Sequence, residues 1–235
     1  MDSSHRLDRA RHDGEIIVEL AAAHLDAPVP NCPDWDGRGL LSHMGRVWHM
    51  LSVFAEKRPD GFPGRDEFPE RVRGGEVEAA RVALDRVDTH MRALPPGTPM
   101  WGWAASQSSD YFHRRYHLEN LVHRVDAEGM AGTASVIDGD EAADAVDERF
   151  GEFAVLSDAR PAGSLHVHRT DGAGEWTLRA EDDGIVVTRE HAKGDAAARG
   201  SGAQLMLAVW GRLPVGELET FGDADLVREW FELAR

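Results

Sequence analysis

The sequence is poor in cysteine and lysine, and it lacks any long hydrophobic run. Its single cysteine, Cys32, has no second thiol in the chain to pair with, which favours a reducing, cytoplasmic setting. Without an apolar run of about 20 residues, no transmembrane helix is expected. The charged segment 1–15 also lacks the apolar core of a signal peptide.

Basic residues are outnumbered by acidic ones, and the formal net charge is −16 at pH 7. This surplus of negative charge disfavours nucleic acid or an anionic membrane as a partner. The basic residues are almost all arginine, because Lys57 and Lys193 are the only lysines, and this bias is typical of a high-GC genome. The Gly-x-Gly-x-x-Gly, P-loop and Gly-x-Ser-x-Gly motifs are also missing, so no such motif announces a catalytic chemistry.

The first half of the chain has the periodicity of helices. Apolar residues recur at helical spacing over residues 5–25, 40–55, 76–94 and 111–130. The breaks between these segments are rich in proline, glycine or aspartate, and they span residues 27–37, 58–70 and 95–103. The pattern predicts an antiparallel four-helix bundle, closed by a further helix over residues 140–157. We therefore expect a first domain at 1–158.

Near Pro161 the period changes from that of helices to that of strands. Apolar and polar residues alternate over residues 163–170, 175–181 and 184–190, which predicts three short antiparallel strands. An apolar helix is expected after Gly200-Ser201-Gly202, with Ser201 as its N-cap, and a last helix is expected over 223–234. The predicted fold class is thus α+β, with a helical bundle followed by a smaller α+β domain at 159–235.

The helix predicted over 111–130 carries a candidate metal pair. Glu119 and His123 are four residues apart, so both side chains leave the same side of the helix one turn apart. A helical wheel places them inside the apolar arc of this helix, which directs them inward. A second pair, His113 and His117, falls on the opposite face, together with Asn120 and Arg124, and is predicted to be solvated.

A third ligand is expected from another helix. His43 lies inside the apolar arc of the helix predicted over 40–55, whereas His49 points away from that arc. A lone histidine on an apolar face is most often a hydrogen-bonded core residue. With Glu119 and His123, however, His43 completes a set of two histidines and one carboxylate, which is typical of a catalytic zinc site with an open fourth position. The competing interpretation of Glu119 is a buried salt bridge with Arg115.

Other residues have two interpretations each. Asp126 can orient His123 as a hydrogen-bond acceptor, or it can pair with an arginine. Arg212, at the end of an apolar run, can bind a carboxylate substrate or can stabilise a helix C-terminus. Cys32 can be a metal ligand or nucleophile, but a buried structural thiol is favoured. Four tryptophans are predicted to pack the bundle rather than bind a ligand: Trp35, Trp48, Trp101 and Trp103.

These segments resemble the mycothiol-dependent maleylpyruvate isomerase family, whose N-terminal bundle is DinB-like. The stretch VPNCPDWDGRGLLSHMGRVW resembles the family's Pro-x-Cys-x-x-Trp segment that leads into the first ligand histidine. The stretch RRYHLENLVHRVDAEGM resembles the family's helix with a glutamate, a histidine four residues later and an aspartate three further on. Residues 175–230 are similar to the family's smaller C-terminal domain.

The resemblance implies a divalent metal, usually zinc, held by His43, Glu119 and His123. It implies mycothiol, a low-molecular-weight thiol, as cosubstrate, and it matches Arg212 to an arginine thought to serve the active site. It further implies an actinobacterial source and a small electrophilic substrate. We expect a monomer or a small homo-oligomer.

The implied chemistry has a physical basis. Zinc lowers the pKa of a coordinated thiol, and the resulting thiolate can add to an alkene conjugated to a carbonyl. The leading hypothesis is therefore an isomerase or a thiol S-transferase. Two alternatives stay open at this point: a non-catalytic, zinc-stabilised module that binds a ligand or partner, and a hydrolase that uses zinc-bound water.

Overall fold

The computed structural model describes residues 1–64, 67 and 74–235. Part of the predicted break at 58–70 therefore lies outside the described residues. Contacts divide the chain into two compact units, Met1–Ser135 and Val136–Arg235, and we describe each by itself. Among the described residues, no helix combines the length and the apolar character that crossing a bilayer requires.

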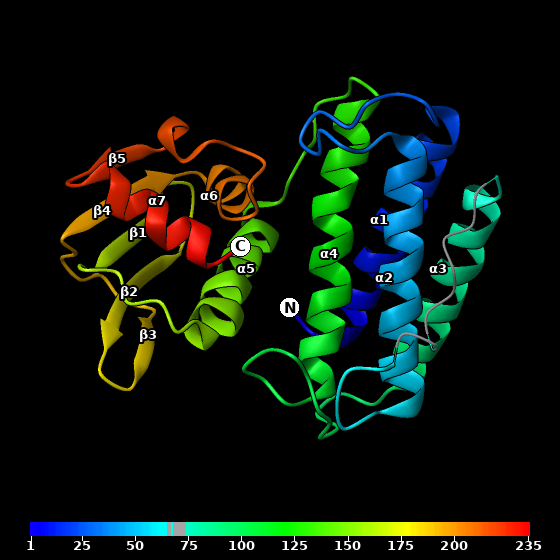
Figure 1. The fold of residues 1–235 in the computed structure, drawn as a ribbon, viewed down its shortest axis with the longest axis horizontal. Coiled ribbons are helices and arrows are strands. Elements are labelled where there is room, and N and C mark those ends of the chain that lie inside the picture. Colours follow the sequence, from blue (N-terminus) through cyan, green and yellow to red (C-terminus); the bar gives the residue numbers. More distant parts are fainter. Residues whose placement is uncertain (65–66, 68–73) are drawn as a thin grey trace. The chain divides into compact units, whose positions relative to one another are not determined.

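The first unit is a bundle of the four predicted helices. Their bounds are α1 Ser3–Ala23, α2 Gly37–Lys57, α3 Glu76–Ala93 and α4 Ser109–Met130. Helix α1 packs most extensively on α4, and α2 packs on α3, so the four helices run alongside one another (Figure 1). The start of α2 is fixed by Asp36, whose side chain accepts a hydrogen bond from the Gly39 backbone N–H at 2.8 Å. This cap lies two turns before His43.

Helix α4 is buried on nearly every face, and the prediction of a solvated face was wrong. His113 and His117 both have 0% exposure. The Nε2 atom of His113 donates to the Met91 carbonyl oxygen of α3 at 3.2 Å. Burial lowers the pKa of His113, which keeps this imidazole neutral. A helical wheel gives the phase of a side chain but not the number of helices that surround it.

The polar side of α4 is satisfied inside the bundle by polar contacts. Asn120 donates to the Ala10 carbonyl oxygen of α1 at 2.7 Å and accepts from the indole Nε1 of Trp48, on α2, at 2.8 Å. Arg124 pairs with the fully buried Asp13 of α1 at 3.1 Å. Buried polar groups of this kind are tolerated because each has a hydrogen-bonding or charged partner.

The second unit begins with α5 Gly139–Glu148, which continues into a π-helical turn η2 Arg149–Phe153 and a 3-10 turn η3 Ala154–Leu156. The sequence assigned this helix to the bundle. In the structure α5 packs on the later helix α6, and Asp147 accepts a hydrogen bond from Trp176 of the sheet at 3.1 Å. The division of the chain therefore lies before α5, whereas the expected boundary lay between 158 and 159. The helix itself was visible in the sequence, but the surface on which it packs was not.

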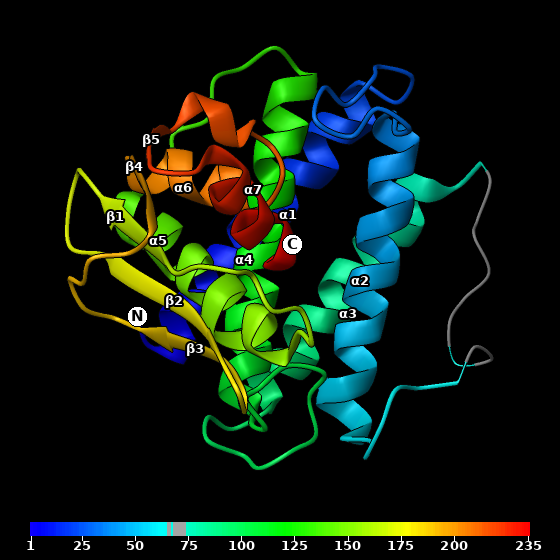
Figure 2. The same ribbon diagram turned by 60° about the vertical axis from the view of Figure 1, so that its left-hand side comes forward.

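In the described part of the chain, the sheet has five strands, two more than predicted; Figure 2 shows how they lie side by side. Their bounds are β1 Leu165–Arg169, β2 Glu175–Glu181, β3 Gly184–Thr188, β4 Ala196–Gly200 and β5 Glu219–Phe221. In the order β3-β2-β1-β4-β5, the predicted antiparallel strands β1 to β3 are confirmed, and β4 runs parallel to β1. Strand β4 was missed because its sequence, AAARG, is alanine-rich, and β5 was missed because it has only three residues.

Two helices complete the second unit. Helix α6 Gly202–Val209 begins at Ser201 with a capping box to Gln204, which confirms the predicted N-cap, and α7 Ala224–Leu233 begins at Asp223. On one face of the sheet Trp176 meets Phe150 of η2, and Phe150 in turn meets Phe231 of α7. The α+β fold class, with a helical N-terminal unit and a mixed C-terminal unit, is confirmed.

Candidate metal centre

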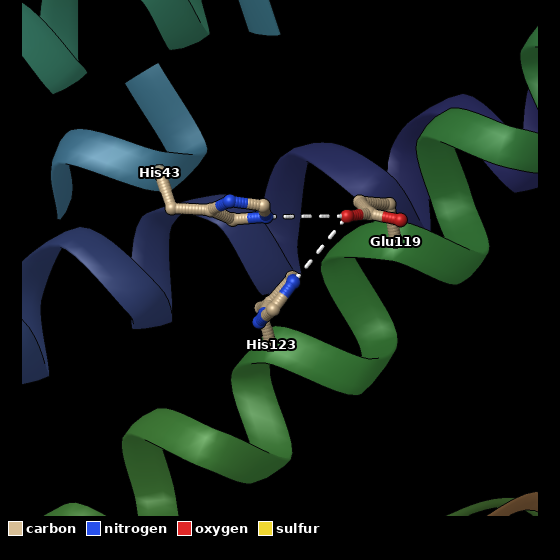
Figure 3. A group of neighbouring side chains, drawn as sticks. All are labelled: His43, Glu119 and His123. Atoms are coloured by element: carbon tan, nitrogen blue, oxygen red, sulfur yellow. Dashed lines mark ion pairs between the residues drawn. The ribbon is translucent and has the colours of Figure 1, made fainter. Parts of the chain in front are cut away.

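Two histidines and a glutamate from two helices converge in the bundle (Figure 3). His43 comes from α2, whereas Glu119 and His123 come from neighbouring turns of α4. The Nε2 atom of His43 lies 3.5 Å from Glu119 Oε1, and the Nε2 atom of His123 lies 3.3 Å from the same oxygen. One carboxylate oxygen and two imidazole nitrogens thus face a common point.

These two distances fit metal ligands better than hydrogen bonds. A hydrogen bond between nitrogen and oxygen is usually 2.7–3.2 Å long. A tetrahedral zinc ion with bonds of about 2.0–2.1 Å separates its ligand atoms by about 3.3–3.4 Å. The observed 3.3 and 3.5 Å are close to that tetrahedral edge. The residues present therefore fit a divalent ion of the zinc type.

Burial differs among the three residues in a way that leaves one open side. The side chains of Glu119 and His123 are only 8% and 4% exposed, so both point inward as the wheel predicted. The His43 side chain is 33% exposed. A partly exposed ligand agrees better with a catalytic ion, which keeps a position for an exogenous ligand, than with a closed structural ion.

Glu119 is held by a second partner. Arg115, one turn earlier on α4, pairs with Glu119 through the other carboxylate oxygen, Oε2. The salt bridge considered as an alternative is therefore present, and it coexists with the convergence of Oε1 on the two histidines. The guanidinium supplies positive charge to a carboxylate that burial would otherwise disfavour, and it fixes which oxygen faces the imidazoles.

Asp126 lies behind His123, where the sequence suggested it. Its Oδ2 atom is 2.9 Å from the Nδ1 atom of His123, and its side chain is 0% exposed. This hydrogen bond fixes the tautomer in which Nδ1 carries the proton, so Nε2 presents its lone pair to the candidate centre. The thiol of Cys32 also approaches Asp126, with Sγ 3.9 Å from Oδ2, and Cys32 is part-buried.

Trp35 is a site residue that the sequence analysis missed. Its ring centroid lies 4.6 Å from that of His43 and 5.8 Å from that of His123, and the ring is stacked on His123. The prediction that Trp35 packs the bundle rather than binds a ligand did not include these contacts with the two histidines. The signal was its position next to the α2 cap, in the same loop as Cys32. That loop is closed by the Trp35 N–H bond to the Cys32 carbonyl oxygen at 2.8 Å.

Arg212 belongs to the second unit. It follows α6, and its Nη1 atom donates to the carbonyl oxygen of Trp210, the C-cap residue, at 2.8 Å. This contact agrees with the interpretation of Arg212 as a cation at a helix C-terminus. A role in binding substrate stays a prediction.

The fold and this centre define a class: a helical-bundle protein with a candidate two-histidine, one-glutamate metal site and a mixed α+β second unit. Family profiles agree with this description. The profile described as the mycothiol maleylpyruvate isomerase N-terminal domain matches residues 7–128. The profile described as the MDMPI C-terminal domain matches residues 139–229.

The chain therefore belongs to the mycothiol maleylpyruvate isomerase family, as the resemblance indicated. Searches of curated proteins and of solved structures find no match. Between them the two profiles span most of both compact units, and the gap between them, 129–138, contains the division at Ser135.

Proposed function

We propose that this protein is a metal-dependent, mycothiol-dependent enzyme that acts on a small electrophilic substrate, by cis–trans isomerisation of maleylpyruvate or by a related S-transfer. One observation carries the proposal: the ligand atoms of His43, Glu119 and His123 converge at the spacing of a tetrahedral ion. The family, named for an isomerase that uses mycothiol, supports it further. A reducing, cytoplasmic setting is part of the same proposal.

Each residue around the centre has a defined task. His43 and His123 present Nε2 and Glu119 presents Oε1 as ligands. Asp126 holds the proton on Nδ1 of His123, so that Nε2 stays deprotonated toward the centre. Arg115 holds the second carboxylate oxygen and keeps Oε1 directed at the histidines. When bound, zinc supplies a lowered thiol pKa, so that thiolate is available at neutral pH.

The reaction follows from the nucleophilicity of that thiolate. In the isomerase, the sulfur of mycothiol adds to an alkene carbon conjugated to a carbonyl, and the displaced electron pair moves onto the carbonyl oxygen. The former double bond is now single and rotates. The electron pair then returns, the carbon–sulfur bond breaks, and thiolate leaves with the trans alkene restored. In an S-transferase the thiol adduct is protonated and released instead.

We further propose that Arg212 binds a carboxylate of the substrate, because a guanidinium offers two parallel donors to a carboxylate. Trp35 is proposed to shield the two imidazoles from water on one side, because its ring lies against both. Asp126 and Arg115 act through the ligands, and we treat them as positioning residues.

The test is turnover of maleylpyruvate, beside a panel of other electrophiles, by metal-free and zinc-loaded protein with mycothiol present or withheld. The proposal expects activity only when zinc and thiol are both present. His43→Ala should abolish it, whereas His49→Ala, on the same helix but bonded to the Glu67 carbonyl oxygen, should not. Hydrolysis of a substrate without thiol would favour a hydrolase, and a bound ion with no turnover of any electrophile would favour a binding module.

A further inference from the structure

The second unit contains another cluster of histidines and one glutamate, outside the candidate centre of the bundle. We call it the strand cluster; its members are His166, His168, Glu175 and His191. The Nε2 atom of His166 lies 2.6 Å from Glu175 Oε2, and the Nδ1 atom of His191 lies 2.8 Å from the same oxygen. The Nδ1 atom of His168 lies 2.9 Å from the other oxygen, Oε1.

The sheet brings these residues together by its register. His166 and His168 are two residues apart on β1, so their side chains leave the same face of the strand. Glu175 lies directly opposite His168 in the antiparallel pairing of β1 with β2. On this strand Leu165 and Val167 are fully buried and alternate with the two histidines. The cluster thus lies on the face opposite the apolar residues of β1.

A tether brings the fourth residue to the same face. Thr177 of β2 is on the same side of its strand as Glu175, and its hydroxyl donates to the Glu190 carbonyl oxygen at 3.2 Å. This bond holds the segment after β3 over the sheet, where the next residue, His191, reaches Glu175. The ring of His191 meets that of His166 edge to face, with centroids 4.9 Å apart. Three contacts to Glu175, the Thr177 tether and the ring contact therefore assemble the cluster.

We propose that the strand cluster is a second binding site for a divalent transition metal ion, with His166 Nε2, His191 Nδ1 and Glu175 Oε2 as its ligands. Ligand atoms of these three residues lie within 4.8 Å of one another. His168 holds the second oxygen of the carboxylate, as Arg115 holds that of Glu119. Two imidazoles and one carboxylate suit zinc, nickel or copper rather than calcium or magnesium.

The arrangement and exposure of the ligands support ion entry. The two oxygens of Glu175 already gather three imidazoles around one carboxylate, so an ion would meet its ligands in one place. An ion would have to spread the observed contacts of 2.6 and 2.8 Å to about 3.3 Å, the tetrahedral edge. The His191 side chain is 78% exposed, so it can make that shift.

The experiment measures zinc bound per chain in the full-length protein, stripped with chelator, dialysed against zinc and analysed by mass spectrometry. The proposal expects about two ions per chain for the wild type, since each of the two clusters binds one. The double variant His43→Ala/His123→Ala should keep about one, held by the strand cluster. His191→Ala should also keep about one, held in the bundle. Combining all three changes should leave none.

His191→Ala is the informative variant because its side chain is exposed and its loss does not threaten folding. Glu175→Gln keeps the shape of the acceptor and removes its charge, so it should lose the same ion. The matched control is His12→Ala, an exposed histidine on α1 that should bind zinc as the wild type does. The proposal is overturned if His191→Ala and Glu175→Gln both bind as much zinc as the wild type. The double variant His43→Ala/His123→Ala lacks the ligands of the bundle centre. Zinc that it still binds therefore tests the strand cluster separately from the proposed enzyme activity.

Discussion

The candidate centre of the bundle and the strand cluster have ligand sets of the same composition, two histidines and one glutamate, but different spacing. In both, two imidazole nitrogens approach one carboxylate oxygen, and a further side chain holds the other oxygen. In the bundle the nitrogen–oxygen distances are 3.3 and 3.5 Å, whereas on the sheet they are 2.6 and 2.8 Å. The first set is spaced for an ion, and the second is closed by hydrogen bonds. Ligand identity alone therefore does not distinguish a preorganised site from one that must open.

The supporting structure explains this difference. In the bundle, the ligands project from helices α2 and α4, and Asp126 and Arg115 hold His123 and Glu119 from behind. On the sheet, one of the ligands is a histidine of the loop after β3 that is mostly exposed. Rigid elements with supporting hydrogen bonds keep ligand atoms apart at a fixed separation, and loops do not. We expect the two sites to differ in affinity and in their dependence on single residues.

The largest expected effect comes from removing a ligand of the bundle centre. His123→Ala should lower kcat/KM for thiol-dependent turnover by on the order of 10²–10³-fold, because a catalytic ion contributes several kcal/mol to transition-state stabilisation. His191→Ala, which changes only the strand cluster, should leave turnover near the wild-type value. Equal losses in the two variants would contradict the assignment of catalysis to the bundle.

Next in size is the difference in zinc affinity between the two clusters. The strand cluster must give up two hydrogen bonds of about 1 kcal/mol each before an ion binds, so its zinc should be held about 30-fold more weakly. Competition with a chromophoric chelator, applied to His191→Ala and to His43→Ala/His123→Ala separately, measures the two constants. Tighter binding by the strand cluster would show that ligand spacing does not determine affinity here.

A smaller loss is expected when the support behind a ligand is weakened. Asp126→Asn keeps the volume and an acceptor oxygen but removes the charge behind His123, and it should weaken zinc binding in the bundle by on the order of tenfold. Cys32→Ala is the matched control, since Cys32 also approaches Asp126. If Asp126→Asn binds zinc as tightly as the Cys32→Ala control does, the carboxylate does not support His123 as a ligand.

The smallest expected effect is on the pH dependence of stability. It comes from His113, a buried histidine that belongs to neither candidate metal cluster. Burial lowers the pKa of His113, so below about pH 6.5 the unfolded chain binds a proton that the folded chain resists. As the pH is lowered below about 6.5, the free energy of unfolding should therefore fall, by at most about 1.4 kcal/mol per pH unit for this one group. In metal-free protein, His113→Gln should show a shallower fall than the wild type, measured by urea unfolding at pH 7 and pH 5.5.

The control for this last prediction is His12→Gln, an exposed histidine of α1, which should follow the wild type. An unchanged slope in His113→Gln would mean that the buried imidazole takes up its proton without a penalty. Zinc binding by reconstituted protein should be unaffected in both variants, since His113 bonds to α3 and not to the candidate centre.

The sequence predicted the positions of the helices well, because periodicity and capping residues are local signals. The four bundle helices, the cap at Ser201 and the strands β1 to β3 were all expected. The predictions that failed concerned which elements pack against a given helix face. The polar face of α4 was expected to meet water, but it meets α1 and α3. A wheel does not reveal that the partners Ala10 and Asp13 on α1 satisfy that face.

The sequence predicted the three candidate ligands, but it did not predict the side chains that surround them. His43, Glu119 and His123 were expected to converge, because their wheels directed them inward. Trp35 was missed as a neighbour of both histidines, since a loop residue has no period to orient it. The salt bridge of Arg115 was treated as an alternative to metal binding, although a carboxylate has two oxygens and can serve both. The strand cluster was missed because strand register, which no wheel represents, assembles it.

The side-chain amide of Asn120, in the bundle core, helps to fix the position of His43 without contacting it. Asn120 bonds to α1 through Ala10 and to α2 through Trp48, and it is itself on α4. It therefore sets the axial register of three helices at once. A slip of α2 by a single residue would move His43 by about 1.5 Å along its axis, whereas a zinc–nitrogen bond tolerates about 0.2 Å. The alignment of the three candidate ligands thus depends on a side chain that is not one of them.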